Sequence, residues 1–136
     1  MSANLIVTTH IFNLAAMKFK YKTYKIEDFI DIVKRKIDRV EGYDPDYYYN
    51  IYGNDEGRGF VPGMQIYVGD TVEVNDDDEE IYPPEVIERK LSSLYSCGTF
   101  QDVIDLAMRQ NNSVSHEKLI ECLNYYSNHD DFLDVA

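Results

Sequence analysis

The longest regular pattern of apolar positions lies between Lys25 and Val40. Apolar residues recur there at intervals of three and four, at Ile26, Phe29, Ile30, Val33, Ile37 and Val40. This spacing places them on one face of an α-helix. Acidic residues fall in its first turn and basic residues nearer its end, as the helix dipole favours. The pattern therefore predicts an amphipathic helix over residues 25–40, with Gly42 as its stop.

Alternating patterns predict strands in three other places. Lysine alternates with Phe, Tyr and Thr over residues 18–24, which indicates a strand with one solvated lysine face. We interpret these lysines as protection of an edge strand, although basic and aromatic residues also occur together in single-strand binders. Residues 47–52 are rich in tyrosine and favour a strand. Apolar and polar residues alternate again over 64–76, with Gly69-Asp70 as a turn or bulge.

The last third of the chain is predicted to be helical. The three helices expected there cover residues 84–96, 98–112 and 113–128. Pro83-Pro84 favours the first start, Thr99 is the expected cap of the second helix, and Ser113 or Ser115 that of the third. Since no repeat or low-complexity linker divides the chain, residues 17–136 are predicted to form a single α+β domain. A small antiparallel sheet should pack there against three to four helices.

The first sixteen residues are a separate question. They are rich in apolar residues, but Thr8, Thr9, His10 and Asn13 interrupt the run, and no basic residue precedes Lys18. A secretory signal needs a basic start and an unbroken apolar core, and a membrane span needs a longer run. We expect residues 1–16 to be an N-terminal extension, either a strand or the result of an alternative start at Met17.

Charge narrows the possible partners. The net charge is −12, with a balance of +4 over residues 17–40 and −16 over residues 41–136. Such a surface repels nucleic acid and anionic membranes and attracts basic proteins. The two cysteines, Cys97 and Cys122, lie far apart and outside any CxxC, which is typical of buried thiols in a reducing compartment, although a disulfide stays open. We expect a cytoplasmic protein that binds neither nucleic acid nor membrane.

The densest charge is a run of five acids, Asp76, Asp77, Asp78, Glu79 and Glu80. A calcium loop needs acids at alternate positions, a glycine at the sharp turn and a closing Glu. This stretch lacks the glycine and carries Pro83 and Pro84 where ligands should be. No pair of carboxylates stands out as a catalytic pair, and the three histidines are scattered. We therefore expect no metal, no cofactor, no catalytic residue and no enzyme activity. The run is either a solvated turn or a surface for a basic partner.

Tyrosine offers a second candidate for a partner surface. Tyr47, Tyr48 and Tyr49 follow an Asp-Pro-Asp turn, and three consecutive residues of a strand cannot all face inward. Tyrosine gives large rigid contact area at interfaces. Either these residues are anchors for a partner, or two of them belong to the core and the third is exposed.

The C-terminal stretch from Phe100 to Val135 resembles a family of small acidic bacterial immunity-type domains. The matching positions are Gln101, Asp102, Val103, Gln110, Leu119, Leu123, Asn124, Tyr125, Tyr126, Asp130 or Asp131, and Phe132. The resemblance covers the last third well and the middle loosely. It implies an antitoxin of a contact-dependent growth inhibition system or a related polymorphic toxin system.

The expected function follows from the charge and the resemblance together. The protein should bind a cognate basic toxin domain, such as a nuclease, and occlude its active site or substrate groove. The residues expected to contact the toxin are Asp76, Asp77, Asp78, Glu79, Glu80, Tyr47, Tyr48, Tyr49, Asp130 and Asp131. Two alternatives stay open: an acidic interaction or nucleic-acid-mimic module without a toxin, and a small enzyme.

Overall fold

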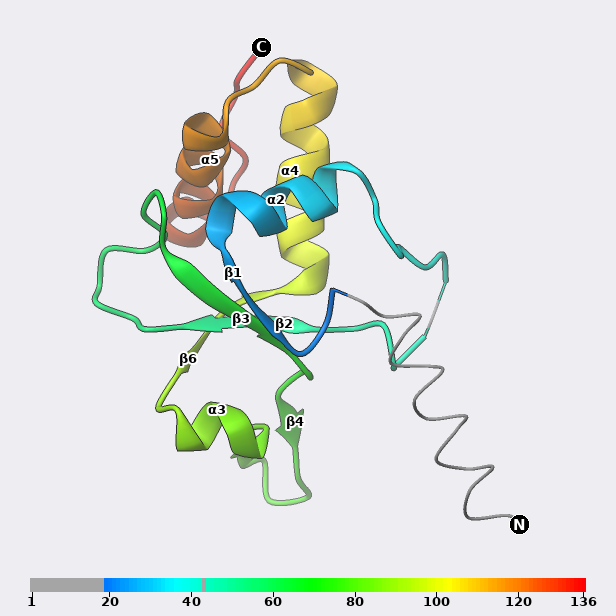
Figure 1. The fold of residues 1–136 in the computed structure, drawn as a ribbon, viewed down its shortest axis with the longest axis vertical. Coiled ribbons are helices and arrows are strands. Elements are labelled where there is room, and N and C mark those ends of the chain that lie inside the picture. Colours follow the sequence, from blue (N-terminus) through cyan, green and yellow to red (C-terminus); the bar gives the residue numbers. More distant parts are fainter. Residues whose placement is uncertain (1–18, 43) are drawn as a thin grey trace.

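The computed structural model describes residues 19–42 and 44–136 (Figure 1). The expectations for residues 1–16, and the start of the predicted first strand at Lys18, lie outside the described residues. The described strands are β1 (Lys22–Lys25), β2 (Asn50–Gly53), β3 (Gln65–Gly69), β4 (Glu73–Val74), β5 (Glu80–Ile81) and β6 (Ser92–Ser96). The described helices are α2 (Ile26–Lys34), α3 (Pro84–Glu88), α4 (Cys97–Gln110) and α5 (His116–His129). The predicted α+β class is confirmed.

The main sheet is antiparallel, with the strand order β1-β3-β2-β6. Tyr24 of β1 lies opposite Ile66 of β3, and Ile51 of β2 lies opposite both Val68 and Tyr95. β1 and β6 are therefore the edges. The strand order confirms the prediction that the lysine-bearing strand is an edge, and Lys22 and Lys25 are exposed. The prediction of one solvated lysine face is wrong at Lys20, which is buried because its Nζ donates to the carbonyls of Asp46 and Tyr48.

Helices α2, α4 and α5 lie together on one side of the main sheet (Figure 1). The core between them holds most of the largest fully buried side chains, among them Phe29, Tyr49, Ile51, Phe100 and Leu123. Each buried side chain of this size contributes about 1.5–3 kcal/mol relative to exposure. Cys97 and Cys122 are buried as free thiols, as predicted.

The opposite face of the sheet carries a second, smaller cluster. Strand alternation sends Tyr52 and Tyr67 to this face, whereas their neighbours Ile51 and Ile66 enter the main core. Val86 of α3 packs on these two rings. This cluster holds α3 and the two-stranded β4–β5 sheet at the end of the molecule opposite α4 and α5 (Figure 1).

The predicted helix over residues 25–40 is correct only in its first part. α2 ends at Lys34, and Lys36 and Asp38 take left-handed conformations with φ of 55° and 54°. Beyond the turn, the Arg39 guanidinium donates to the Val33 carbonyl at 2.9 Å and to the Asp105 carboxylate of α4 at 2.7 Å. These tertiary bonds require the chain to turn back, so the apolar spacing of the last turns does not decide their structure.

Two other expected elements divide. The segment 84–96 is not one helix, since α3 ends at Glu88, Lys90 is left-handed and residues 92–96 form β6 against β2. The alternating stretch 64–76 divides after Gly69, as the turn or bulge expected at Gly69-Asp70 implies, and the Asp70 carbonyl accepts from the Tyr52 hydroxyl. In the segment 84–96, pairing with a distant strand overrides local propensity.

The caps of the last two helices differ in how well they were predicted. The predicted cap of α4 is wrong, because the helix begins at Cys97 and its cap position is Ser96, three residues before Thr99. The Thr99 hydroxyl instead accepts from the Ser96 hydroxyl at 3.2 Å. Ser115 caps α5 as expected, because its hydroxyl accepts from the Lys118 N–H at 3.1 Å.

Candidate functional site

The five consecutive acids lie on a β-hairpin, residues 73–81, which we call the acidic hairpin. Its strands pair antiparallel, with Glu73 opposite Ile81 and Val74 opposite Glu80. Asn75 builds the loop between them. Its side-chain oxygen accepts from the N–H groups of Asp77 and Glu79, both at 2.9 Å. The hairpin backbone is thus held by one asparagine and not by the acids.

The acids are consequently free to face solvent. Asp76 to Glu80 are all exposed, and Asp78 takes the left-handed conformation with φ of 59°, which Asp tolerates better than most residues. Two of the five carboxylates accept bonds from neighbours, Glu79 from the Asn75 amide at 3.3 Å and Glu80 from the Tyr82 hydroxyl. Within the described chain no cation pairs with any of the five.

The whole end of the molecule around the hairpin is anionic. From Gly59 to Glu88 the sequence holds nine Asp or Glu residues and no Lys, Arg or His. The next cation, Arg89, lies over the Tyr67 ring at 4.9 Å. Burial, followed by the charge of Glu85, raises the pKa of Tyr67 to about 12. Of the nine acids, Asp70 pairs with Lys20 at 3.0 Å, and the other eight form no ion pair within the described residues.

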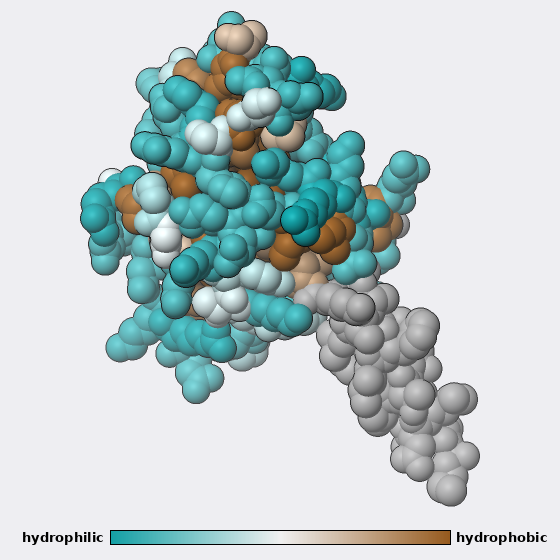
Figure 2. Space-filling model, turned by 45° about the horizontal axis from the view of Figure 1, so that its top comes forward, coloured by the Kyte–Doolittle hydropathy of each residue, from teal (hydrophilic) through white to brown (hydrophobic). Residues whose placement is uncertain are grey.

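Exposed aliphatic side chains accompany the acids. Val74 and Ile81 of the hairpin are 61% and 47% exposed, and Ile87 of α3 is 63% exposed. Apolar side chains surrounded by charge are a composition found at protein interfaces. The expected site missed these three residues, although Val74 could have been found as an aliphatic within a hairpin that otherwise carries acids. Elsewhere the face shown in Figure 2 is mainly hydrophilic, with hydrophobic areas that are small and separate.

The structure corrects the tyrosine part of the expected site. Tyr47 and Tyr49 are 5% and 1% exposed and belong to the core, whereas Tyr48 is half-buried. The Gln101 amide donates to the hydroxyls of Tyr47 and Tyr49, the latter at 3.2 Å. Burial raises the pKa of both phenols. Two tyrosines in the core, as one alternative expected, are observed because Phe19 and Phe29 pack against their rings. The third, Tyr48, is half-buried against the core and not exposed.

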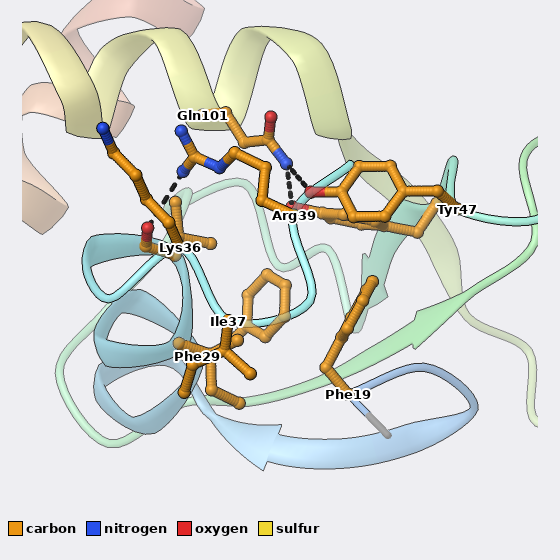
Figure 3. A pocket seen from close by; sticks show the side chains of 10 residues that line it. Phe19, Phe29, Lys36, Ile37, Arg39, Tyr47 and Gln101 are labelled. Atoms are coloured by element: carbon orange, nitrogen blue, oxygen red, sulfur yellow. Dashed lines mark hydrogen bonds between the residues drawn. The ribbon is translucent and has the colours of Figure 1, made fainter. Parts of the chain in front are cut away.

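A small cavity lies beside the buried tyrosines. Arg39, Gln101 and Tyr47 lie at one side of it and Phe19 and Phe29 at the other (Figure 3). Its volume is about 10 Å³, which is room for about one water molecule. The Arg39 guanidinium in its wall is already held by Asp105. We interpret these polar groups as a structural network that fixes α2 against α4.

Asp130 and Asp131 are exposed but do not join the acidic hairpin. They follow α5, where Asp130 takes the left-handed cap conformation and its N–H donates to the Tyr126 carbonyl at 2.8 Å. Asp130 lines a groove with residues of β6 and α5, and none of the hairpin residues borders that groove. The expected site is thus two separate acidic surfaces.

Several positions that carry the family resemblance have structural contacts. Gln101 holds the buried tyrosines, the Gln110 side chain accepts from the Val135 N–H at 2.9 Å, and Asn124 bonds the backbone of Phe60. Leu119 and Leu123 are fully buried. These positions of the resemblance therefore serve the packing of α4, α5 and the C-terminal tail. Their contacts are structural and do not form a ligand site.

The described residues form neither a metal site nor a membrane span. Over residues 19–42 and 44–136, no group of three His, Cys, Asp or Glu side chains is arranged to hold a metal ion. None of the described helices combines the length and apolar character that a bilayer span requires.

Comparison with known proteins gives one match. A family model described as a domain of unknown function, DUF7716, matches residues 24–135, which include every described strand and helix except the first two residues of β1. No curated protein and no solved structure matches the chain.

Proposed function

Since the chain belongs to the DUF7716 family, whose function is unknown, we propose its function from the surface that its fold presents. We propose that the domain binds a basic protein through the acidic hairpin, and that this protein is a toxin which the domain neutralises. The observation that carries the proposal is the set of five exposed carboxylates, Asp76 to Glu80, which no cation of the described chain neutralises.

The hairpin is an electrostatically unfavourable arrangement in the isolated domain. Two like charges about 4 Å apart repel by about 1 kcal/mol even in water. Asn75 supplies the loop hydrogen bonds, so the fold does not need the acids for the turn. A basic partner would relieve the repulsion and would be steered to this end, with association accelerated by about 10- to 1,000-fold at low salt. Val74, Ile81 and Ile87 would supply desolvated contacts.

A toxin that cleaves nucleic acid is the partner class that fits this surface best. Its substrate is a polyanion, so its active-site cleft must be basic. A narrow hairpin with consecutive carboxylates can enter such a cleft in place of the phosphates. We also propose a cytoplasmic location, which the two free buried thiols of Cys97 and Cys122 support, because disulfides are rare in that compartment.

The proposal is tested with the C-terminal domain of the protein encoded by the neighbouring gene, which the proposal expects to be the toxin domain. Association and dissociation rates are measured by surface plasmon resonance at low and high salt, together with inhibition of toxin nuclease activity. The test variant replaces Asp76, Asp77 and Asp78 by Asn and Glu79 and Glu80 by Gln. We expect its association rate to fall about tenfold or more at low salt, with a weaker salt dependence than the wild type.

A matched control separates the hairpin from net charge. It neutralises three Asp and two Glu at exposed positions elsewhere, namely Asp28, Asp55, Asp134, Glu41 and Glu117. The control should bind the toxin with a smaller loss in rate than the hairpin variant. Equal losses would show that only total charge matters and would overturn the hairpin as the site. Binding to a basic nucleic-acid-binding protein, but not to the neighbouring toxin domain, would favour the mimic module without a toxin.

A further inference from the structure

The two edges of the main sheet are protected differently. β1 carries Lys22 and Lys25, and edge lysines discourage pairing with other chains. β6, the other edge, has the sequence Ser-Ser-Leu-Tyr-Ser and no charged residue. Over residues 19–42 and 44–136, no strand pairs with its outer side. β6 is therefore an unprotected edge.

The register shows which backbone groups of β6 face outward. The Cys97 N–H donates to the Tyr49 carbonyl of the chain preceding β2 at 3.1 Å. Hydrogen-bonded and non-hydrogen-bonded pairs alternate along an antiparallel ladder, and Ser96 lies opposite Asn50 in the next pair. The N–H of Ser96 therefore points away from β2. The ladder is irregular between Ile51 and Tyr52, so the usable part of the edge is its C-terminal half.

An open groove runs beside this half of β6. It is lined by Leu94 and Ser96 of β6, Thr99 of α4, and Tyr126, Ser127 and Asp130 at the end of α5, and its volume is about 440 Å³. The groove is shallow and open to solvent, a shape that suits an extended segment lying along the edge. The hydroxyl groups of Ser96, Thr99, Tyr126 and Ser127 can form hydrogen bonds with a peptide. Leu94 offers an apolar contact.

Charge selects the kind of occupant. The groove lining contains the Asp130 carboxylate and no Lys or Arg. Asp130 also faces Tyr126 in this lining, and after desolvation its charge is the next cause that raises the pKa of Tyr126. A second copy of this chain, with a net charge of −12, would bring like charges together. A segment that carries lysine or arginine complements the groove.

We propose that the outer edge of β6 and this groove form a second docking site, at which an extended lysine-containing segment of a partner protein adds as a further strand of the sheet. Main-chain hydrogen bonds supply affinity in this mode of recognition, and pockets beside the edge supply selectivity. The site does not depend on the acidic hairpin, since none of its lining residues lies between Glu73 and Ile81.

Two synthetic peptides test the site without knowledge of the natural partner. Both have ten residues that alternate Val and Thr, with Lys at both ends in one and Glu at both ends in the other. Each is titrated into the isotope-labelled full chain, and amide chemical shifts and hydrogen exchange are followed by NMR. We expect the lysine peptide to shift the amides of Leu94, Ser96 and Thr99 and to slow exchange of the Ser96 N–H at least about tenfold. The glutamate peptide should bind at least about tenfold more weakly.

Ser96 provides a matched pair of variants. Ser96→Pro removes the outward N–H at a position with φ of −87°, close to the range of proline, and leaves the bond from Cys97 to Tyr49 in place. Ser96→Ala removes the hydroxyl and keeps the N–H. We expect the proline variant to lose peptide binding at least about tenfold and the alanine variant to retain it. Should the proline variant fail to fold, Leu94→Lys places a charge on the edge and must weaken binding of the lysine peptide.

Three results would overturn the proposal. The first is equal peptide binding by the wild type and by a folded Ser96→Pro or Leu94→Lys variant. The second is a set of shifts confined to residues 73–81, which would assign the peptide to the acidic hairpin. The third is a dimer in sedimentation equilibrium that Ser96→Pro dissociates, which would make a second copy the occupant. Loss of toxin binding by the hairpin variant leaves this proposal intact, because the peptide probes β6 directly.

Discussion

The side chain of Asn124 on α5 pairs with the backbone of Phe60 as a neighbouring strand would. Its Nδ2 donates to the Phe60 carbonyl at 2.8 Å, and its Oδ1 accepts from the Phe60 N–H at 2.9 Å. Phe60 is buried and stacks on Tyr95 with ring centroids 5.7 Å apart. This pair anchors the long connection between β2 and β3 to the helical layer.

Replacement of Asn124 should therefore destabilise the fold. Asn124→Ala leaves the N–H and the carbonyl of Phe60 without their partner, which costs about 1–3 kcal/mol. The free energy of unfolding is measured by urea denaturation. Asn128→Ala, at an exposed position one turn later on α5, is the control and should change it by less than about 0.5 kcal/mol. An equal effect of the two variants would contradict the structural role of the pair.

Gly59 should not tolerate a side chain, for a reason that involves the same asparagine. Its φ is +68°, and a Cβ would lie 2.5 Å from the Asn124 Oδ1. Gly59→Ala should cost more than Gly57→Ala, since Gly57 has a similar φ of +77° but open space around it. The left-handed strain of about 1 kcal/mol is common to both variants, and the clash is not. The double variant Gly59→Ala with Asn124→Ala should lose less stability than the sum of the losses of its two single variants. Thermal denaturation of the wild type, the three single variants and the double variant checks both expectations.

Lys20 should contribute more to stability than the carboxylate that it meets. Its Nζ is held by the carbonyls of Asp46 and Tyr48 at 2.9 and 2.7 Å and by Asp70 at 3.0 Å. The lysine side chain is 2% exposed and that of Asp70 is 54% exposed. Lys20→Met removes three bonds at once and should cost about 1–3 kcal/mol. Asp70→Asn keeps the two carbonyl bonds and should cost less than about 1 kcal/mol, again by urea denaturation. A larger loss of stability in Asp70→Asn than in Lys20→Met would be evidence against the hydrogen bonds from Lys20 to the two carbonyls.

The sequence pattern correctly predicted those features that depend only on residues near one another in the chain. The apolar face of α2, the cap at Ser115 and the exposure of Asp76 to Glu80 follow from spacing and charge alone. Pattern could not place the end of α2, because the bond from Arg39 to Asp105 joins residues 66 positions apart. It could not show that residues 92–96 pair with β2, since their composition suits either element.

The candidate site was predictable to a similar degree. Its charge could be read from the sequence, whereas the burial of Tyr47 and Tyr49 depends on Gln101, Phe19 and Phe29, which the fold brings from other elements. The separation of Asp130 from the acidic hairpin likewise depends on how α5 is placed against β6.

Stability should fall in alkaline solution because the core contains phenols. Burial raises the pKa of Tyr95 and of Tyr67 to about 12, from the ordinary value of 10.0. Between these values the unfolded chain loses protons that the folded chain keeps, so the free energy of unfolding decreases as pH rises from about 10 to about 12. Urea denaturation across this range measures the slope. Tyr95→Phe removes one of the phenols and should reduce the slope, although it also loses the bond to the Leu123 carbonyl. A slope equal to that of the wild type would contradict the burial of the Tyr95 hydroxyl.

Presentation of the acids should matter as well as their number. Asn75→Ala keeps all five carboxylates but removes the acceptor for the N–H groups of Asp77 and Glu79. The loop should then sample many conformations, and a partner must order it on binding, which weakens affinity for the toxin domain by about tenfold. Asp78→Asn is the converse variant. It removes one charge and keeps the left-handed turn, because Asn adopts φ of about +57° readily. Its loss of affinity for the toxin domain should arise mainly from a slower association rate. This loss should be smaller than that of Asn75→Ala. If Asn75→Ala bound as tightly as the wild type, charge density alone would explain recognition, and the hairpin geometry would have no part in it.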